Sequence, residues 1–300
     1  MRVGVDIGGT KTEAVVVEDD GTVSGHLRLP TGWGAEQVVA TAVAAVTGLA
    51  ESAGLSPAEF RAIGIGIPGR VDSEAGIVSH AINLGVEHLE LAAILHERLG
   101  APVRVENDVN AAALGAFHVL EQAPSASMGY LNLGTGLAAG LVLRGELWRG
   151  ARGAAGEIGH ILVDPAGPID LDGQRGGLEV MASGSGIARQ WATGEDNAVS
   201  AMLDAADAGD ERALEIRRRL FDGVAGAVRI LVLTVDVDLV VIGGGIGGLG
   251  ERLMTGVDAV FEGWAGQSPF IESLELAGRV RVLEPGTPVA ALGAAHLGGE

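Results

Sequence analysis

The chain has 300 residues, of which 47% are hydrophobic and 20% charged, a composition typical of a globular protein with one large domain or two smaller ones. Its formal net charge of −19 argues against a nucleic-acid partner, and the absence of cysteine excludes disulfides, thiolate metal sites and cysteine nucleophiles. Met1 and Arg2 run directly into a strand pattern, and Gly, Pro or charged residues interrupt every long apolar run. We therefore expect a cytoplasmic protein without a signal peptide, with no membrane association and no nucleic-acid partner.

The N-terminus is predicted to form a β-hairpin around a glycine turn. Residues 3–7 and 13–17 are apolar and rich in valine, and Gly8, Gly9 and Thr10 lie between them. Two such runs joined by a short glycine turn are typical of antiparallel strands.

The remaining elements follow from apolar periodicity and from the glycines that end helices. Strands are expected at 23–29, 62–69, 128–133, 137–143, 238–242 and 279–283, and a further strand begins at 103. Helices are expected at 37–53 and 89–99, after the strand that begins at 103 as far as about 120, within 178–191 and 198–233, after the glycine segment 243–250, and at 289–297. This alternation of strands and helices predicts an α/β fold.

The segment 128–143 repeats the plan of the N-terminus at an offset of 126 residues, counted from the alignment of Gly4 with Tyr130. Both segments read as a strand, a turn rich in Gly and Thr, and a second strand. Their placement at the head of each half makes a duplicated domain plausible.

Asn107 and Asp108 follow an apolar strand pattern and precede an alanine-rich helix. Ligands of α/β sheets bind at the carboxyl ends of strands, where a carboxylate can accept a proton from a bound hydroxyl. Asn and Asp are also favoured as helix N-caps, so this segment alone leaves both interpretations open.

The two glycine turns are candidate phosphate sites, because glycine allows consecutive N–H groups to converge on oxygen atoms. A Rossmann turn or a P-loop opens into a helix, whereas both turns here open into a second strand. Asp6 at the first turn could hold Mg²⁺ through water. Lys11, the only lysine of the chain, is either phosphate-facing or there by coincidence.

An ordered set of motifs resembles the ROK family of sugar kinases and regulators, within the superfamily of actin, Hsp70 and hexokinase. The set spans the chain and consists of residues 6–11, 67–69, 106–112, 133–136, 156–160, 178–179 and 242–245. The resemblance implies a two-domain, actin-like (ribonuclease H-like) ATPase fold with a cleft between the domains. We expect a smaller domain of residues 1–115 plus 287–300 and a larger one of 116–286.

The resemblance also implies residue roles. Asp108 would be the catalytic base, and the sugar would be held by Gly69, Asn107, Asp108, Glu157, His160 and Glu179. ATP would be held by Asp6, Gly8, Gly9, Thr10, Lys11, Gly134, Thr135, Gly136, Gly244 and Gly245. Mg²⁺ would accompany ATP, and a homodimer is usual in such a family.

One departure concerns the structural zinc of the family, which a His and three Cys hold. Residues 170–177 stand where those thiolates would be, with Asp170, Asp172 and Gly177 in their places. One histidine with two loop carboxylates is a poor zinc site, so we expect no structural zinc and a His160 that serves the sugar alone.

The leading interpretation is an ATP-dependent hexose kinase acting on the 6-hydroxyl of an aldohexose, with glucose first. N-acetylglucosamine, N-acetylmannosamine, mannose and fructose are the alternative sugars. A sugar-sensing regulator without catalysis is the alternative of another class. Family repressors carry a DNA-binding domain before the glycine turn; because only five residues precede Asp6 here, we expect no such domain.

Overall fold

Two units of α/β structure make up the chain in the computed structural model, which describes residues 1–170, 173–194 and 197–297. Unit 1 comprises Met1–Pro124, Gly145–Ala154 and Pro288–Glu300, and unit 2 comprises Ser125–Arg144 and Ala155–Thr287. The sequence placed the first boundary after residue 115, which lies inside helix α3 (Asp108–Val119).

A five-stranded sheet forms the centre of unit 1, in the order β3-β2-β1-β4-β8. These strands are β1 (Arg2–Ile7), β2 (Lys11–Val17), β3 (Val23–Pro30), β4 (Ile63–Ile67) and β8 (Val103–Asn107). β1 pairs antiparallel with β2, as the hairpin prediction requires, and parallel with β4, which pairs parallel with β8. The carboxyl ends of β1, β4 and β8 therefore meet at one edge.

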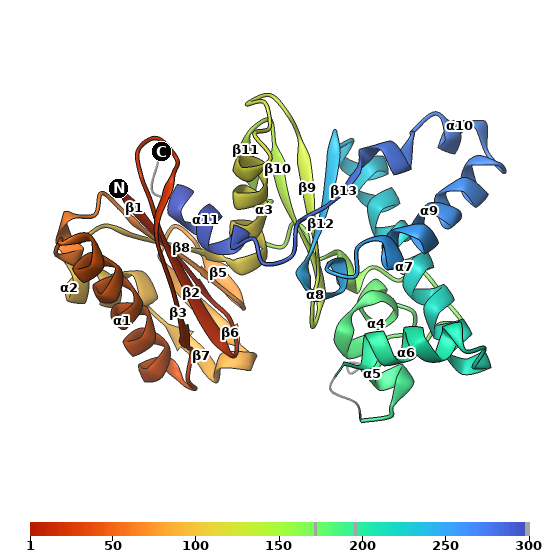
Figure 1. Cartoon of the computed structure of the whole chain (residues 1–300), viewed down its shortest axis with the longest axis horizontal. Helices are drawn as coiled ribbons and strands as arrows, with labels where there is room; N and C mark the ends of the chain where they lie inside the picture. The colour runs from red at the N-terminus through yellow and green to blue at the C-terminus, as the bar shows by residue number, and fades with distance from the viewer. Residues whose placement is uncertain (171–172, 195–196, 298–300) are drawn as a thin grey trace. The chain divides into compact units, whose positions relative to one another are not determined.

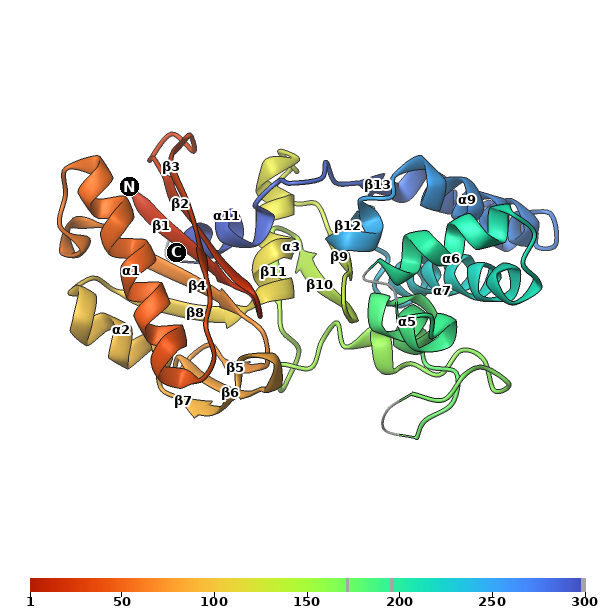
Figure 2. The same cartoon turned by 60° about the horizontal axis from the view of Figure 1, so that its bottom comes forward.

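Helices cover both faces of this sheet, and all of β4 is buried between them. α1 (Ala35–Ala53) packs against β2 and β3 with α2 (Leu91–Leu99) beside it (Figure 2). On the other face α11 (Val289–His296) lies against β1, β4 and α3 (Figure 1). Each fully buried Val, Ile or Leu of this core contributes roughly 1.5–3 kcal/mol.

Glycines provide the surface on which α11 lies. A Cβ atom at Gly4 would stand 1.8 Å from the carbonyl oxygen of Ala291, and one at Gly64 would stand 1.7 Å from that of Ala294. Gly115 of α3 is equally close to Val289. The helix backbone thus approaches the sheet to a distance that any other residue would prevent.

A small antiparallel sheet, β5-β6-β7, extends unit 1 beyond β4. Its strands are β5 (Arg70–Asp72), β6 (Ile77–Ala81) and β7 (Val86–Leu89), and the short β11 (Glu146–Trp148) also belongs to unit 1. The sequence predicted none of these strands and began the helix of 89–99 too early. Leu89 closes β7, and α2 begins at Leu91.

Unit 2 contains strands in the order β10-β9-β12-β13, which matches β2-β1-β4-β8 of unit 1 in position and direction. The strands are β9 (Met128–Leu133), β10 (Leu137–Leu143), β12 (Leu239–Gly243) and β13 (Val280–Val282). The second predicted hairpin is therefore confirmed. The shared strand order supports the internal duplication that the sequence suggested.

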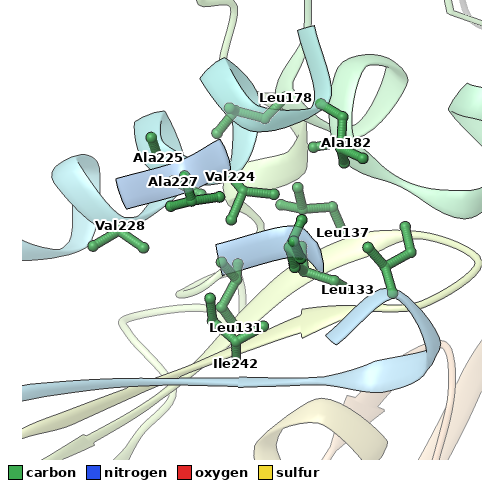
Figure 3. Packing of buried hydrophobic residues seen from close by; sticks show 14 of the residues in the cluster. Leu131, Leu133, Leu137, Leu178, Ala182, Val224, Ala225, Ala227, Val228 and Ile242 are labelled. Carbon is green, nitrogen blue, oxygen red and sulfur yellow. The ribbon is translucent and has the colours of Figure 1, made fainter. Parts of the chain in front are cut away.

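The core of unit 2 lies between this sheet and its helices, among them α4 (Leu178–Ala182) and α7 (Glu211–Val235). Figure 3 shows Leu131 and Leu133 of β9 facing Leu178 of α4 and Val224 of α7. The other helices of unit 2 are α5 (Gly184–Trp191), α6 (Ala198–Asp207), α8 (Gly244–Gly247), α9 (Glu251–Ala265) and α10 (Pro269–Glu272). Short 3₁₀ turns occupy Pro57–Glu59, Ile82–Leu84, Ile158–His160 and Leu276–Arg279. In the described part of the chain, no helix has the length and apolar character needed to cross a bilayer.

Candidate active site

Two of the predicted carboxylates lie at the carboxyl edge of the unit 1 sheet. Asp6 near the end of β1 is in register with Gly66 of β4, which is in register with Glu106 of β8. A Cβ atom at Gly66 would stand 3.7 Å from the Cα of Asp108. The glycine therefore leaves room for the first turn of α3 beside β4, and Asp108 comes close enough for its charge to act on Asp6.

Asn107 performs the capping that the sequence left open. Its side-chain oxygen accepts hydrogen bonds from the N–H groups of Val109 (2.9 Å) and Asn110 (3.2 Å). Its amide nitrogen donates to the carbonyl oxygen of Gly69 at 3.3 Å. Asp108 is the first residue of α3, and its Oδ1 accepts from the N–H of Val109 at 3.0 Å. The helix start thus holds the Asp108 carboxylate in a fixed place, which suits a base.

The pKa of Asp6 is raised to about 7. Burial is the largest cause, followed by the negative charges of Asp108 and Glu13, whereas the charge of Lys11 lowers it. A carboxyl group in this situation gains from a bound cation, since the cation offsets both the lost hydration and the repulsion. The surroundings of Asp6 therefore fit the predicted Mg²⁺.

The first glycine turn, residues 8–10, joins β1 to β2, with the N–H of Gly8 bound to the carbonyl oxygen of Lys11 at 2.9 Å. Lys11 Nζ lies 3.5 Å from Glu13 Oε2. Burial raises the pKa of Glu13, but hydrogen bonds from Arg28 and His26 and the charge of Lys11 outweigh it and hold that pKa below its usual value. The lysine side chain is half exposed, so its ammonium group remains accessible to a phosphate.

Glu106 is a residue of this region to which the sequence assigned no role. Its carboxylate is 2% exposed, and Oε1 accepts from the N–H of Asn107 (2.9 Å) and the amide of Asn110 (3.0 Å). Oε2 accepts from Ser73 Oγ (3.1 Å) and Arg149 Nε (2.6 Å). The signal that could have identified it is a carboxylate directly after Val105, near the end of an apolar strand pattern, because a buried charge requires partners.

Glu179 lies beside the second glycine turn and beside the 3₁₀ turn of residues 158–160. Its Oε2 accepts the N–H of Leu137 at 3.0 Å and would stand 2.7 Å from a Cβ atom at Gly136. Its Cβ is 3.2 Å from the corresponding position at Gly159, which lies between Ile158 and His160. Glu157 directly precedes that 3₁₀ turn, and both Glu157 and His160 are exposed. Glu179 and the turn that carries His160 are thus neighbours within unit 2.

A cavity of about 770 Å³ in unit 2 is lined by Gly134, Thr135 and Gly245. The turn of residues 134–136 is tied to α5, because the N–H groups of Gly184 and Ser185 donate to the carbonyl oxygens of Gly134 (2.8 Å) and Thr135 (3.0 Å). Gly244 has a φ of 82°, and a Cβ atom there would stand 2.5 Å from the carbonyl oxygen of Leu133. Glycine is therefore required where the chain after β12 approaches the end of β9.

The loop that stands where the ROK resemblance implies a zinc site is held by protein contacts at both ends. Ile169 and Arg175 form an isolated bridge, and the N–H of Gln174 donates to Asp170 Oδ1 at 2.8 Å. Asp172 lies outside the described residues. Within residues 1–170, 173–194 and 197–297, no three His, Asp or Glu side chains are grouped as a metal site.

The fold of the chain is that of the actin-like ATPases. The ROK hexokinase from Thermus thermophilus matches with a TM-score of 0.80 and 32% identity over 98% of this chain and 96% of that one. The ROK glucokinase from Streptomyces griseus, solved with glucose and AMPPNP, matches with a TM-score of 0.75 and 31% identity over 99% and 98%. The α/β fold class predicted from the sequence is thus confirmed.

Sequence comparison gives the family itself. The ROK family model matches residues 2–298. The glucokinase of Halalkalibacterium halodurans is 32% identical over 88% of this chain and 86% of its own. The N-acetylmannosamine kinase of Escherichia coli is 32% identical over 89% of both chains. The chain belongs to the ROK family, as its motifs predicted.

Proposed function

We propose that the protein is an ATP-dependent hexose kinase that phosphorylates the 6-hydroxyl of an aldohexose, with glucose as the first candidate. The observation that carries this proposal is the pair of Asp6 and Asp108 at the carboxyl edge of the unit 1 sheet, beside the amide of Asn107. Relatives named glucokinase and a related structure that holds glucose and AMPPNP support the same pair of substrates.

Asp108 would act as the general base. Its carboxylate accepts the proton of the 6-hydroxyl while that oxygen forms a bond to the γ-phosphorus of ATP. The bond from the γ-phosphorus to the bridging oxygen breaks, and ADP leaves with the electron pair. A positioned base contributes roughly 10²–10⁴-fold, so positioning and charge neutralisation supply most of the acceleration.

The sugar hydroxyls would be bound by Asn107 and Gly69 in unit 1 and by Glu157, His160 and Glu179 in unit 2. Carboxylates accept and an imidazole or amide can donate, so together they distinguish hydroxyl configurations. The exposed positions of Glu157 and His160 agree with side chains that await a polar ligand.

The nucleotide would use the glycine turns. The turn of Gly8, Gly9, Thr10 and Lys11 and that of Gly134, Thr135 and Gly136 would hold phosphates through N–H groups, and Gly244 and Gly245 would lie beside the adenosine. The cavity bounded by Gly134, Thr135 and Gly245 supports the assignment in unit 2. Mg²⁺ held near Asp6 through water would neutralise charge on the phosphates.

A coupled ADP-release assay over a panel of sugars tests this function. Turnover should be highest on glucose, and N-acetylmannosamine is the first alternative because kinases of that sugar are equally identical to this chain. N-acetylglucosamine, mannose and fructose complete the panel. Absence of turnover on every sugar would refute the kinase assignment and favour a regulator without catalysis.

We further propose that the enzyme acts in the cytoplasm as a homodimer. Exposed apolar side chains of unit 2, among them Ile161, Leu162 and Val163, favour burial against another protein surface. Analytical ultracentrifugation should give twice the mass of 30.3 kDa, and a single-chain mass at micromolar concentration would contradict the dimer.

A further inference from the structure

A cavity of about 600 Å³ in unit 1 is formed by residues that the proposed kinase site does not use. One wall is the β5–β6 hairpin, and the other is the glycine-rich loop that follows β11. The two walls meet where a Cβ atom at Gly153 would stand 3.9 Å from the carbonyl oxygen of Val71. This volume is within the usual range for small-molecule sites, roughly 300–1,000 Å³.

The cavity gathers basic side chains on a chain whose net charge is −19. Arg70, Arg149 and Arg152 line it together with His80. In the described part of the chain, no carboxylate oxygen lies within 4.0 Å of the guanidinium of Arg70 or of Arg152. Two such groups, each with a planar set of N–H donors, suit the oxygen atoms of a phosphoryl group.

Acidic groups also line the cavity but are engaged or solvated. Asp72 Oδ1 accepts the N–H groups of Glu74 (3.2 Å) and Ala75 (3.0 Å), which keeps this oxygen in the turn between β5 and β6. Glu74 is exposed to solvent. The hydroxyl of Ser79, also in the lining, offers a neutral donor and acceptor for a polyol.

Arg149 connects this cavity to the start of α3. Its Nε donates to Glu106 Oε2 at 2.6 Å, and the other oxygen of Glu106 accepts from Asn107 and Asn110. An anion that attracts Arg149 competes with Glu106 for the guanidinium. Since Glu106 is almost fully buried, any loss of this partner acts on the hydrogen bonds that position Asn107.

We propose that the cavity binds the phosphate monoester of a sugar, with the phosphoryl group on Arg70 and Arg152 and a sugar hydroxyl on Ser79, and that its occupancy lowers turnover through Arg149 and Glu106. The statement that occupancy lowers turnover rests on the proposed kinase function, because a sugar phosphate would then be the product of the reaction. The statement that the cavity binds a sugar phosphate does not rest on that function, because binding can be measured on the protein without ATP.

Isothermal titration of the whole protein, without nucleotide, tests the binding of a sugar phosphate with glucose 6-phosphate, inorganic phosphate and glucose as separate probes. Glucose 6-phosphate should bind, and the double variant Arg70→Ala/Arg152→Ala should bind it at least tenfold more weakly. Arg98→Ala, an exposed arginine of α2, is the matched control and should leave binding unchanged.

Equal affinity of the double variant and its parent would overturn the site. Equal affinity for glucose 6-phosphate and inorganic phosphate would overturn the sugar part of the assignment. In steady-state kinetics, added glucose 6-phosphate should lower the kcat of the wild type. The double variant Arg70→Ala/Arg152→Ala should have the kcat of the wild type without glucose 6-phosphate and should not be inhibited when it is added. Inhibition that excess glucose fully removes in both proteins would overturn the link through Arg149. Absence of turnover with intact binding would instead refute the kinase assignment alone.

Discussion

The side-chain amide of Asn107 donates a hydrogen bond to the carbonyl oxygen of Gly69, across 3.3 Å between the ends of β8 and β4. The same side chain caps α3 through its oxygen. One residue thus joins the loop after β4 to the helix that begins with Asp108. Gly69, with a φ of 100°, needs the conformational freedom of glycine to present that carbonyl.

Replacement of Asn107 should therefore affect both stability and substrate binding. Asn107→Ala removes the cap and should lower the free energy of unfolding by about 1 kcal/mol. It also removes the bond to Gly69, so KM for the sugar should rise more than kcat falls. Asn107→Asp keeps a capping oxygen and should recover most of the stability in chemical denaturation. An Asn107→Asp protein as unstable as Asn107→Ala would contradict the capping role.

The assignment of Asp108 as base predicts a different result. Asp108→Ala should reduce kcat by roughly 10²–10⁴-fold in the ADP-release assay, because the 6-hydroxyl loses its proton acceptor. Glucose binding, measured by calorimetry without ATP, should remain detectable. Glu97→Ala removes an exposed carboxylate of α2 and provides the matched control. Full activity of the Asp108 variant would refute the assignment.

The raised pKa of Asp6 predicts that function opposes stability at this position. The pKa of Asp6 is about 7 in the folded chain, whereas an ordinary aspartate has a pKa of 3.8. Between these two values the folded chain binds a proton that the unfolded chain has lost, and this stabilisation disappears as pH rises through 7. In metal-free protein, Asp6→Asn should therefore raise the melting temperature at pH 8 and change it little at pH 4. Turnover with Mg-ATP should fall in the same variant. A lower melting temperature at pH 8 would show that the carboxylate stabilises the fold.

The sequence predicted the residues at strand ends better than the contacts that hold them. The two hairpins, the strand before Asn107 and the ROK motifs depend on local patterns, namely β-branched runs, glycine turns and an ordered set of signatures. The β5-β6-β7 sheet was missed because its strands are short and only partly buried. The partners of Glu106 were missed because Ser73 and Arg149 lie 33 and 43 residues away along the chain.

The stacked imidazoles of His118 and His296 predict a pH dependence of stability. Their ring centroids are 3.8 Å apart, between α3 and α11. Burial, then the charges of His118 and Arg2, lower the pKa of His296 to about 4, and burial and Arg2 also lower the pKa of His118. A histidine whose pKa is lower when folded binds protons preferentially in the unfolded chain, so stability is complete above about 6.5 and is lost as pH falls towards 4.

Denaturation of wild type and His296→Gln between pH 7 and pH 5 measures this effect. The wild type should lose stability over that interval, and the variant should lose less because one titrating ring is gone. Exposed His88, replaced in the same way, should leave the wild-type slope unchanged. Parallel slopes for wild type and His296→Gln would contradict the prediction.

Because α11 lies directly against glycines of the sheet, adding a single methyl group at one of them should strongly reduce the stability of the protein. At Gly64 an added Cβ would lie 1.7 Å from the carbonyl oxygen of Ala294, so Gly64→Ala must push the helix away from β1 and β4. Overpacking of this kind costs roughly 1–3 kcal/mol or more, because both contacting groups are backbone and neither can rotate aside. The control is Gly263→Ala, on an exposed face of α9, where no atom lies within 4 Å of the new Cβ. Alanine at this position should stabilise the helix by roughly 0.5–1 kcal/mol. Thermal denaturation should thus move the two melting temperatures in opposite directions, and a Gly64→Ala protein as stable as the wild type would show that α11 is not held against β4.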